Sequence, residues 1–342
     1  EGRFTEAIAC FRKVVALRPR NSAAHINLGI MCSYQARMDE ALASLRRAVE
    51  LTPDSIEAHA ALIFLLAGGQ LLPPEEILTI SRRFEADACP KNFTPPQPRR
   101  IDTGRKTRVA FMSAEIGDHA VVLFLETFLR NHDRERFEIT LYSSKRRTEA
   151  GAAPLLALAH ASHELSDTSD EEARRQVLAD DIDILIDTTS HLPGGRLRLL
   201  SQRCAPIQCH YLGFFGTTGV SAIDYFIGDD EITPPEFAGH FSERLIRLPR
   251  LWVAYTPPSD APAPEALSPP GEITLGCFNN LLKVREDTLS VWAAAMTAVP
   301  DARLIIKDAK CADPYNRQRI ADFLSTRGVA AGRLEFMTKI PS

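Results

Sequence analysis

A sequence repeat with a period of 34 residues occupies the first 70 residues of the chain. Residues 3–28 and 37–62 align without a gap and share about eleven identical residues. The identical pairs include Arg3/Arg37, Glu6/Glu40, Ala7/Ala41, Arg12/Arg46, Val15/Val49, Leu17/Leu51, Pro19/Pro53, His25/His59 and Leu28/Leu62. In the first copy, apolar residues recur at the spacing of one helix face, namely Ala7, Ile8, Phe11, Val14 and Val15. Such a face needs a neighbouring helix to cover it, so the repeat predicts stacked helices.

The period and the turn residues are typical of tetratricopeptide repeats. Pro19 and Pro53 end their helices, because proline lacks an N–H group and clashes with the preceding turn. Repeats of this kind stack into an α-solenoid whose concave face binds peptides, although so few of them could instead only cap the next domain. Residue 1 aligns with Gln35, so we expect the chain to begin inside a repeat unit, as a fragment of a longer protein.

The rest of the chain is predicted to follow an α/β pattern. From Arg108 onward, helices alternate with short apolar strands, at 109–113, 137–143, 163–165, 183–187, 207–212, 225–227 and 245–248. This alternation predicts a largely parallel, doubly wound sheet. A second unit begins near Gly271 with strands at 273–278, 303–307 and 334–337. A complete nucleotide-binding half has about five or six strands, so we expect the second unit to be truncated.

Four segments therefore make up the predicted domain organisation. Residues 1–69 are the repeats, with the first unit incomplete, and 70–107 are a helix and a linker. Residues 108–270 are the first α/β domain, and 271–342 are the start of the second. The Pro-rich basic run from Phe93 to Lys106 could contact an anion, but its composition favours an extended connection between domains.

Polar loops follow three strands of the first α/β domain. His119 comes after the first strand, and His191 and Arg196 follow the strand that ends at Asp187. A loop rich in Gly and Thr, 212–219, follows the next strand. A single loop histidine is more often structural, but ligands of such sheets bind beyond the carboxyl ends of the strands. Glycines, hydroxyls and imidazoles at one sheet edge predict a cleft for a polar small molecule.

Composition excludes several other classes of protein. The formal charge of −4, from 40 basic and 44 acidic residues, does not suit a nucleic-acid surface. The longest apolar run, 60–69, is about half of a membrane-spanning helix. The seven cysteines are scattered without a Cys-x-x-Cys pair, which is a reduced, intracellular pattern and not a disulfide frame or a zinc site. We expect a cytoplasmic protein without a metal, a membrane segment or a nucleic-acid partner.

Several motifs in order resemble the protein O-GlcNAc transferases, and most of all the bacterial members and the plant SPINDLY-type relatives of glycosyltransferase family 41. The motifs are residues 108–119, 133–138, 141–143, 205–208, 212–219, 223–225 and 277–283. The resemblance implies a GT-B enzyme, in which two Rossmann-like domains face each other across a cleft and the repeats steer a protein acceptor. Its implied activity is the inverting, metal-independent transfer of N-acetylglucosamine from UDP-GlcNAc to Ser or Thr, with no cofactor.

The resemblance also assigns roles to single residues. His119 matches the family's active-site histidine, a candidate base, and Leu212 and Gly213 match positions against the donor sugar. Asn280 matches a glutamine that contacts the donor, and Lys283 matches the lysine that neutralises the diphosphate leaving group, as a nearby point charge can.

The remaining assignments concern the loops of the first α/β domain. Thr217, in the Gly/Thr-rich loop, is a further donor-binding residue. His191 and Arg196 are possible site residues, with a structural loop histidine as the alternative for His191.

Some residues depart from the family pattern. Ala120 stands where Pro is usual, Phe214–Phe215 where Tyr-Pro is usual, Asn280 replaces Gln, and Leu282 replaces an aromatic residue. The identity of the sugar therefore stays open, and an O-fucosyltransferase that uses GDP-fucose and an N-glucosyltransferase are alternative activities. A tetratricopeptide adaptor without catalytic activity is a further alternative. The donor-binding His-Thr-Thr loop and a later ribose-binding Asp of the family are not in this sequence, so we expect these 342 residues alone to be inactive.

Overall fold

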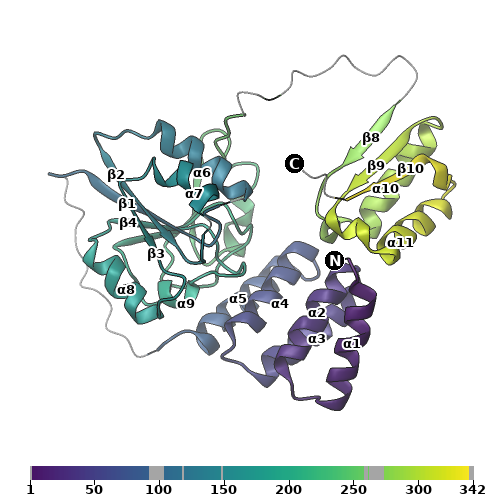
Figure 1. Cartoon of the computed structure of the whole chain (residues 1–342), viewed down its shortest axis with the longest axis horizontal. Helices are drawn as coiled ribbons and strands as arrows, with labels where there is room; N and C mark the ends of the chain where they lie inside the picture. Colours follow the sequence, from purple (N-terminus) through teal and green to yellow (C-terminus); the bar gives the residue numbers. More distant parts are fainter. Residues whose placement is uncertain are drawn as a thin grey trace. The chain divides into compact units, whose positions relative to one another are not determined.

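The computed structural model describes residues 2–91, 104–117, 119–147, 149–257, 261 and 273–338 (Figure 1). The chain divides into two compact units. Unit 1 comprises Glu1–Thr52, Gly68–Gln70 and Ala261–Ser342, and unit 2 comprises Pro53–Ala67 and Leu71–Asp260. The division into two units follows contacts between residues and does not test the four segments predicted along the sequence, which remain a prediction. Most of the Pro-rich run, 93–106, and the expected start of the second α/β domain at Gly271 lie outside the described residues.

Unit 1 begins with the helices predicted from the repeat: α1 (Phe4–Leu17), α2 (Ser22–Tyr34) and α3 (Met38–Leu51). Asn21 caps α2 by accepting a hydrogen bond from the Ala24 N–H group. The apolar face of α3 is buried, and Gly29 of α2 lies so close to it that an added Cβ would be 2.5 Å from Cγ of Leu45. The repeat prediction is confirmed, including the 34-residue offset between the starts of α1 and α3.

The remainder of unit 1 is a small α/β segment. Its three parallel strands lie in the order β10 (Leu334–Met337), β9 (Arg303–Lys307) and β8 (Thr274–Cys277). The helices α10 (Glu286–Ala298) and α11 (Pro314–Ser325) pack on them, with short turns at η2 (Leu281–Lys283), η3 (Ala309–Ala312) and η4 (Ala331–Arg333). Leu289, Ile306 and Ile320 are fully buried in its core. The three predicted strands are all present.

The first helices and the C-terminal α/β segment are in contact inside unit 1. Oδ2 of Asp313 accepts hydrogen bonds from the Phe4 N–H group and from Nε2 of Gln35, both at 3.1 Å. The guanidinium of Arg37 lies over the ring of Tyr315, 4.3 Å from its centroid. The helices α1–α3 and the C-terminal α/β segment therefore share one set of contacts.

Unit 2 contains the predicted doubly wound sheet, whose seven strands are all parallel, in the order β3-β2-β1-β4-β5-β6-β7. The chain works outward from β1 first in one direction and then in the other, so β1 and β4 form the switch point where ligands of such sheets bind. The strands are β1 (Thr107–Ser113), β2 (Phe137–Ser143), β3 (Ala161–Glu164), β4 (Ile184–Asp187), β5 (Ile207–His210), β6 (Tyr225–Asp229) and β7 (Arg244–Leu248).

Helices cover both faces of this sheet (Figure 1). Side chains alternate along β1: Val109 and Phe111 belong to the apolar cluster with α6 (Ala120–Asn131) and α7 (Glu149–Leu156). Ala110 and Met112 belong to the cluster on the other face, with α8 (Asp170–Ala179) and α9 (Leu197–Leu200). The same cluster includes Ile63 of α4 (Ile56–Gly69) and Phe84 of α5 (Pro74–Ala88). The helix predicted before the linker is therefore part of the core of unit 2.

Two helices of unit 2 are shorter than predicted. The sequence predicts one helix over 149–161, but α7 ends at Leu156. Residues 161–164 instead pair with β2 as strand β3. Helix α9 has only four residues, where the sequence predicts 195–202. A short 3-10 helix, η1 (Pro235–His240), precedes β7.

Candidate functional site

A tight turn at the carboxyl edge of the sheet follows β5, at Leu212 and Gly213. Leu212 has φ +74°, which is rare for a residue with a side chain. A Cβ atom on Gly213 would lie 2.0 Å from the carbonyl oxygen of Thr188, so only glycine fits there. The Leu212 side chain is buried in the apolar cluster of β1, β2 and α6. The predicted contact of Leu212 with a donor sugar can therefore come only from its backbone.

The rest of this loop is held by Glu243, which is buried and follows η1. Its carboxylate accepts hydrogen bonds from the Thr217 hydroxyl at 2.7 Å, the Thr218 N–H group at 2.7 Å and the Thr218 hydroxyl. The Thr217 hydroxyl, predicted to bind the donor, is therefore buried and anchors the loop. The N–H groups of residues 213–216 donate no hydrogen bond within the described part of the chain. Phe214 is fully buried, whereas Gly213, Phe215 and Gly216 keep exposed surface from which a ligand could reach their N–H groups.

His191 also has a structural position. Its ring is buried, with Nε2 2.8 Å from the Thr218 carbonyl oxygen and with edge contacts to the rings of Phe84 and Phe214. Burial lowers the pKa of His191 to about 4, so the ring is neutral and its Nε2–H donates to that carbonyl. These contacts support the structural alternative for His191.

Arg196 is committed to the protein as well. Its guanidinium forms an ion pair with Asp170 at 3.0 Å and donates to the carbonyl oxygens of Leu165 and Thr168. These contacts join the start of α9 to the start of α8 and support a structural role for Arg196.

His119, in contrast, is open to solvent, with 44% of its side chain exposed. It is the N-cap of α6, and its Nδ1 accepts a hydrogen bond from the Val121 N–H group at 3.3 Å. Its Nε2 lies 3.9 Å from Oε2 of Glu115, whose other oxygen is 3.6 Å from Nζ of Lys145. Because Nδ1 is an acceptor, the neutral ring carries its proton on Nε2. An exposed imidazole, a carboxylate and an amine therefore meet beyond the end of β1.

The predicted residues of unit 1 lie around the turn η2. Oδ1 of Asn280 accepts hydrogen bonds from the Leu282 N–H group and from Nζ of Lys310, both at 3.0 Å. Asp308 accepts from the Leu281 N–H group and lies 3.5 Å from the same amine. Lys283 is exposed, and its amine has no hydrogen bond or ion pair to the described residues. Sequence reasoning missed Lys310, a second cation beside the predicted donor loop.

Two further residues were missed in unit 2, Glu243 and His210. His210 is the last residue of β5 and is fully buried beside Asp187, at 2.9 Å. The signal that could have found it is a histidine at the end of a predicted buried strand, where an apolar residue is expected.

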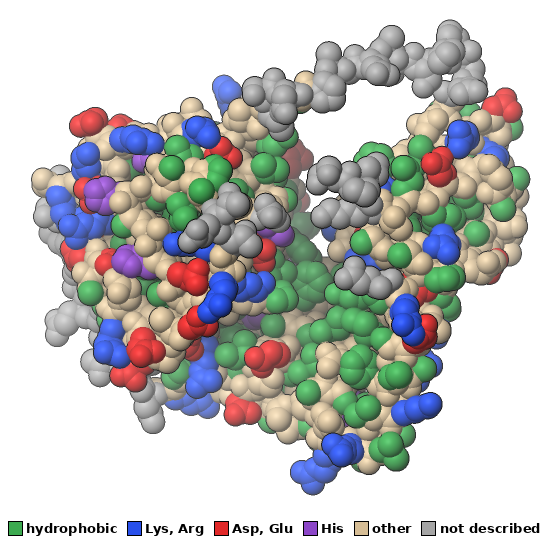
Figure 2. Space-filling model, in the orientation of Figure 1, with side chains coloured by type: hydrophobic (Ala, Val, Ile, Leu, Met, Phe, Trp, Pro, Cys, Tyr) green, Lys and Arg blue, Asp and Glu red, His purple; other side chains and the backbone are tan. Residues whose placement is uncertain are grey.

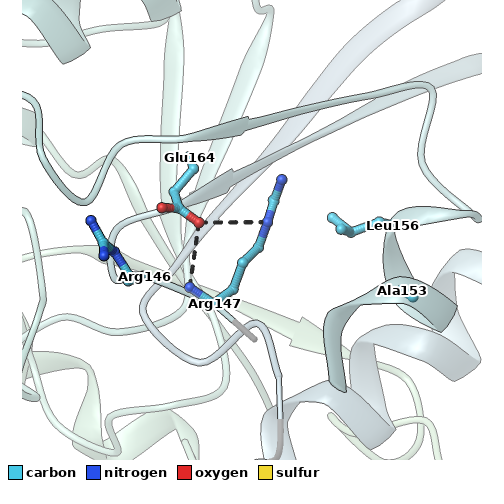
Figure 3. A pocket seen from close by; sticks show the side chains of 5 residues that line it. All are labelled: Arg146, Arg147, Ala153, Leu156 and Glu164. Carbon is cyan, nitrogen blue, oxygen red and sulfur yellow. Dashed lines mark hydrogen bonds and ion pairs between the residues drawn. The ribbon is translucent and has the colours of Figure 1, made fainter. Parts of the chain in front are cut away.

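A hollow of about 560 Å³ lies between the end of β3 and α7 (Figure 3). Its lining comprises Arg146, Arg147, Ala153, Leu156 and Glu164. The guanidinium of Arg147 is 3.8 Å from the Glu164 carboxylate, and that of Arg146 is 2.8 Å from the Asp167 carboxylate, so all three charges of the hollow are paired. None of the predicted site residues lines it.

On the face of unit 2 that Figure 2 shows, Lys and Arg side chains lie among Asp and Glu side chains. In the described ranges, no group of three His, Cys, Asp or Glu side chains could hold a metal ion. Over the same residues, no helix combines the length and the apolar character needed to cross a membrane.

Comparison with known proteins gives matches along the chain. Residues 89–254 match the model of glycosyl transferase family 41, and residues 1–66 match a tetratricopeptide repeat model. The probable UDP-N-acetylglucosamine–peptide N-acetylglucosaminyltransferase SPINDLY of Arabidopsis thaliana is 32% identical over 248 residues, 70% of this chain and 27% of that protein. The Petunia hybrida SPINDLY is 30% identical over 70% of this chain and 26% of its own length.

A solved structure agrees with the whole fold. An O-GlcNAc transferase mutant from Thermobaculum terrenum superposes with a TM-score of 0.91 and 33% identity, over 100% of this chain and 65% of that one. The chain spans about a quarter of the length of the SPINDLY relatives and about two thirds of this structure.

Proposed function

Because this chain belongs to glycosyl transferase family 41, we propose that it is part of a protein O-GlcNAc transferase. The reaction is the transfer of N-acetylglucosamine from UDP-GlcNAc to Ser or Thr hydroxyls of proteins, with inversion at the sugar and without a metal. The observation that carries the proposal is the 33% identity and 0.91 TM-score to an O-GlcNAc transferase along the complete chain.

The loop after β5 supports binding of the donor. A sugar or phosphate oxygen needs N–H donors at close range, and a backbone without a side chain allows that approach. Gly213 supplies such a backbone, and the N–H groups of residues 213–216 are without partners among the described residues. We assign the donor sugar to this turn, with Leu212 contributing only its backbone.

His119 and Lys283 are the two side chains that take part in the proposed reaction. The exposed amine of Lys283 balances the charge that develops on the leaving diphosphate. His119 touches the reacting hydroxyl or a donor oxygen through Nε2. In the observed arrangement Nε2 is a donor, so His119 can act as a base only after Nδ1 takes up the ring proton and loses the Val121 hydrogen bond.

The test is an assay of the full-length protein with labelled nucleotide sugars and acceptor proteins. We expect transfer from UDP-GlcNAc, which His119→Ala and Lys283→Ala each lower by about 100-fold or more. The control is Lys13→Ala, which also removes a positive charge, but from the exposed face of α1. We expect it to leave the rate unchanged. Absence of transfer from every nucleotide sugar, together with absence of donor binding, would refute the proposal.

Competition between nucleotides separates the related activities. Displacement of a labelled donor by UDP and not by GDP supports the GlcNAc donor, whereas the reverse supports a GDP-fucose enzyme. One observation favours the second candidate, the GDP-fucose enzyme. Asn280 departs from the family's Gln, and its Oδ1 already accepts a hydrogen bond from Lys310.

The tetratricopeptide repeats support a protein acceptor, because stacked helices of this kind offer a peptide-binding face. The scattered, unpaired cysteines support a cytoplasmic location for the proposed enzyme. Fractionation of cells that express the full-length protein tests this location.

A further inference from the structure

His210 stands between two hydrogen-bond acceptors. Its Nδ1 lies 2.9 Å from Oδ2 of Asp187, and its Nε2 lies 2.8 Å from the carbonyl oxygen of Phe214. The ring is fully buried, so water does not replace either partner. A carbonyl oxygen can only accept, which puts a proton on Nε2.

Asp187 accepts as well. Its Oδ1 accepts a hydrogen bond from the Thr189 N–H group at 3.1 Å, and its Oδ2 accepts from the Ser190 N–H group at 2.9 Å. Two N–H donors stabilise the carboxylate form of this group, and a carboxylate beside Nδ1 of His210 favours a proton on that nitrogen too. The geometry therefore describes an imidazolium paired with a carboxylate, both buried.

The surroundings of the ring agree with a charged form. Burial lowers the pKa of His210, but the hydrogen bond and charge of Asp187 outweigh it, so the pKa is raised. One other titratable group acts on it: the Glu243 carboxylate raises its pKa further. The nearby His191 is neutral. The remaining close side chain, Phe226 of β6, is apolar and lies with its ring centroid 5.3 Å away.

The pair spans the tight turn of the loop. The hydrogen bond from Nε2 to Phe214 closes residues 210–214 around Leu212 and Gly213, the positions with φ +74° and with the backbone against Thr188. Asp187 holds the other side through the N–H groups of the residues that follow Thr188. Strained backbone persists only where its surroundings fix it, and these contacts fix it here.

We propose that His210, as an imidazolium between Asp187 and the Phe214 carbonyl, is a positioning residue that holds the Leu212–Gly213 turn in the shape that receives the donor sugar. This inference rests on the proposed function, since it takes the sugar to bind at that turn. It predicts that the hydrogen bond to Phe214, and not the bulk of the ring, is what the donor requires.

Two substitutions separate the two ends of the ring. His210→Gln keeps an amide N–H near the Nε2 position, toward Phe214, whereas His210→Asn keeps one near the Nδ1 position, toward Asp187. We expect His210→Asn to weaken UDP-GlcNAc binding and kcat/KM at least about tenfold while UDP binding is unchanged, because only the sugar contact is lost. His210→Gln should recover most of the loss, and His240→Asn, a partly exposed histidine, is the control.

Equal loss of UDP and UDP-GlcNAc binding in both variants would show a merely structural role and overturn the proposal, and so would wild-type behaviour of His210→Asn. If the wild-type protein transfers no sugar at all, the proposed function fails instead. NMR of the histidine ring nitrogens tests the charged form without any activity. We expect two protonated nitrogens on His210 at pH 7, and a single one would refute the imidazolium.

Discussion

At Gly213 the backbone leaves no space for a side chain. An added Cβ would lie 2.0 Å from the Thr188 carbonyl oxygen, which is part of the backbone and cannot rotate away. We therefore expect Gly213→Ala to lower the free energy of unfolding by about 1–3 kcal/mol and to weaken UDP-GlcNAc binding. Urea unfolding and donor titration of the purified protein measure the two effects.

Gly239 provides the matched control, because an added Cβ there meets no atom within 4 Å. Gly239→Ala should change the free energy of unfolding by less than about 0.5 kcal/mol. If both glycine variants behave alike, the close approach at Gly213 does not exist in solution.

His191 predicts a dependence of stability on pH. Because burial lowers its folded pKa to about 4, the unfolded chain binds a proton between about pH 6.5 and 4 that the folded chain does not. The free energy of unfolding therefore falls as the pH falls through this range, by about 3 kcal/mol from this residue alone. Above about pH 6.5 the effect of His191 is absent.

His191→Gln isolates this contribution, since a glutamine amide can still donate to the Thr218 carbonyl but does not titrate. The measurement is urea unfolding of both proteins at several pH values between 4 and 7. We expect the variant to lose less stability on acidification than the wild type; parallel pH curves would contradict the buried, neutral histidine.

The residues of the site could be predicted unevenly from the sequence. The loops of His119 and Asn280 lie beyond strand ends as expected, because strand order in an alternating α/β chain determines which loops share an edge. The direction of a side chain within a loop is not contained in that pattern. His191 and Thr217 therefore have structural positions that became visible only with Phe84 and Glu243 in place.

At the scale of elements, α5 belongs to the core of the α/β unit. Phe84 on α5 is fully buried, and its ring contacts the rings of His59 on α4 and His191 in the loop after β4. Phe84→Ala should lower the free energy of unfolding by about 3–5 kcal/mol, because the cavity cannot close around three separate elements. Thermal and urea unfolding give the value.

Leu123 is the control for this change, since it is also an apolar helix residue but is 46% exposed on α6. Leu123→Ala should change the stability by less than about 0.5 kcal/mol. A small effect of Phe84→Ala would mean that α5 packs only loosely on the sheet.

Elements with strong apolar alternation were predicted with the observed bounds, as β2, β9 and β10 show. Those that depend on local detail were not. Helix α7 is shorter because residues 161–164 pair with β2, and an added Cβ on Gly195 would lie 1.8 Å from the Ser190 carbonyl oxygen, in a turn where the sequence predicts helix. The packing of α4 and α5 on the α/β domain could not be predicted from the periodicity of their apolar residues. An apolar helix face shows that the helix packs on something, but not which element it packs on.

At the scale of the whole molecule, Asp313 joins the first and last parts of the sequence in unit 1. It is buried and accepts hydrogen bonds from Phe4, Gln35 and the Tyr315 N–H group. Removing a buried acceptor leaves these donors without partners, so Asp313→Ala should cost about 2–3 kcal/mol. The loss should affect α1–α3 and the C-terminal α/β segment together.

The two tryptophans of the chain make this measurable, because Trp252 lies in unit 2 and Trp292 in unit 1. Compact units with their own cores commonly unfold as separate cooperative transitions. In single-tryptophan proteins made by Trp252→Phe or Trp292→Phe, we expect Asp313→Ala to lower the urea midpoint seen by Trp292 and to leave that of Trp252 in place. Phe84→Ala should do the reverse. One common transition, shifted equally for both tryptophans by either change, would show that the chain unfolds as one cooperative body.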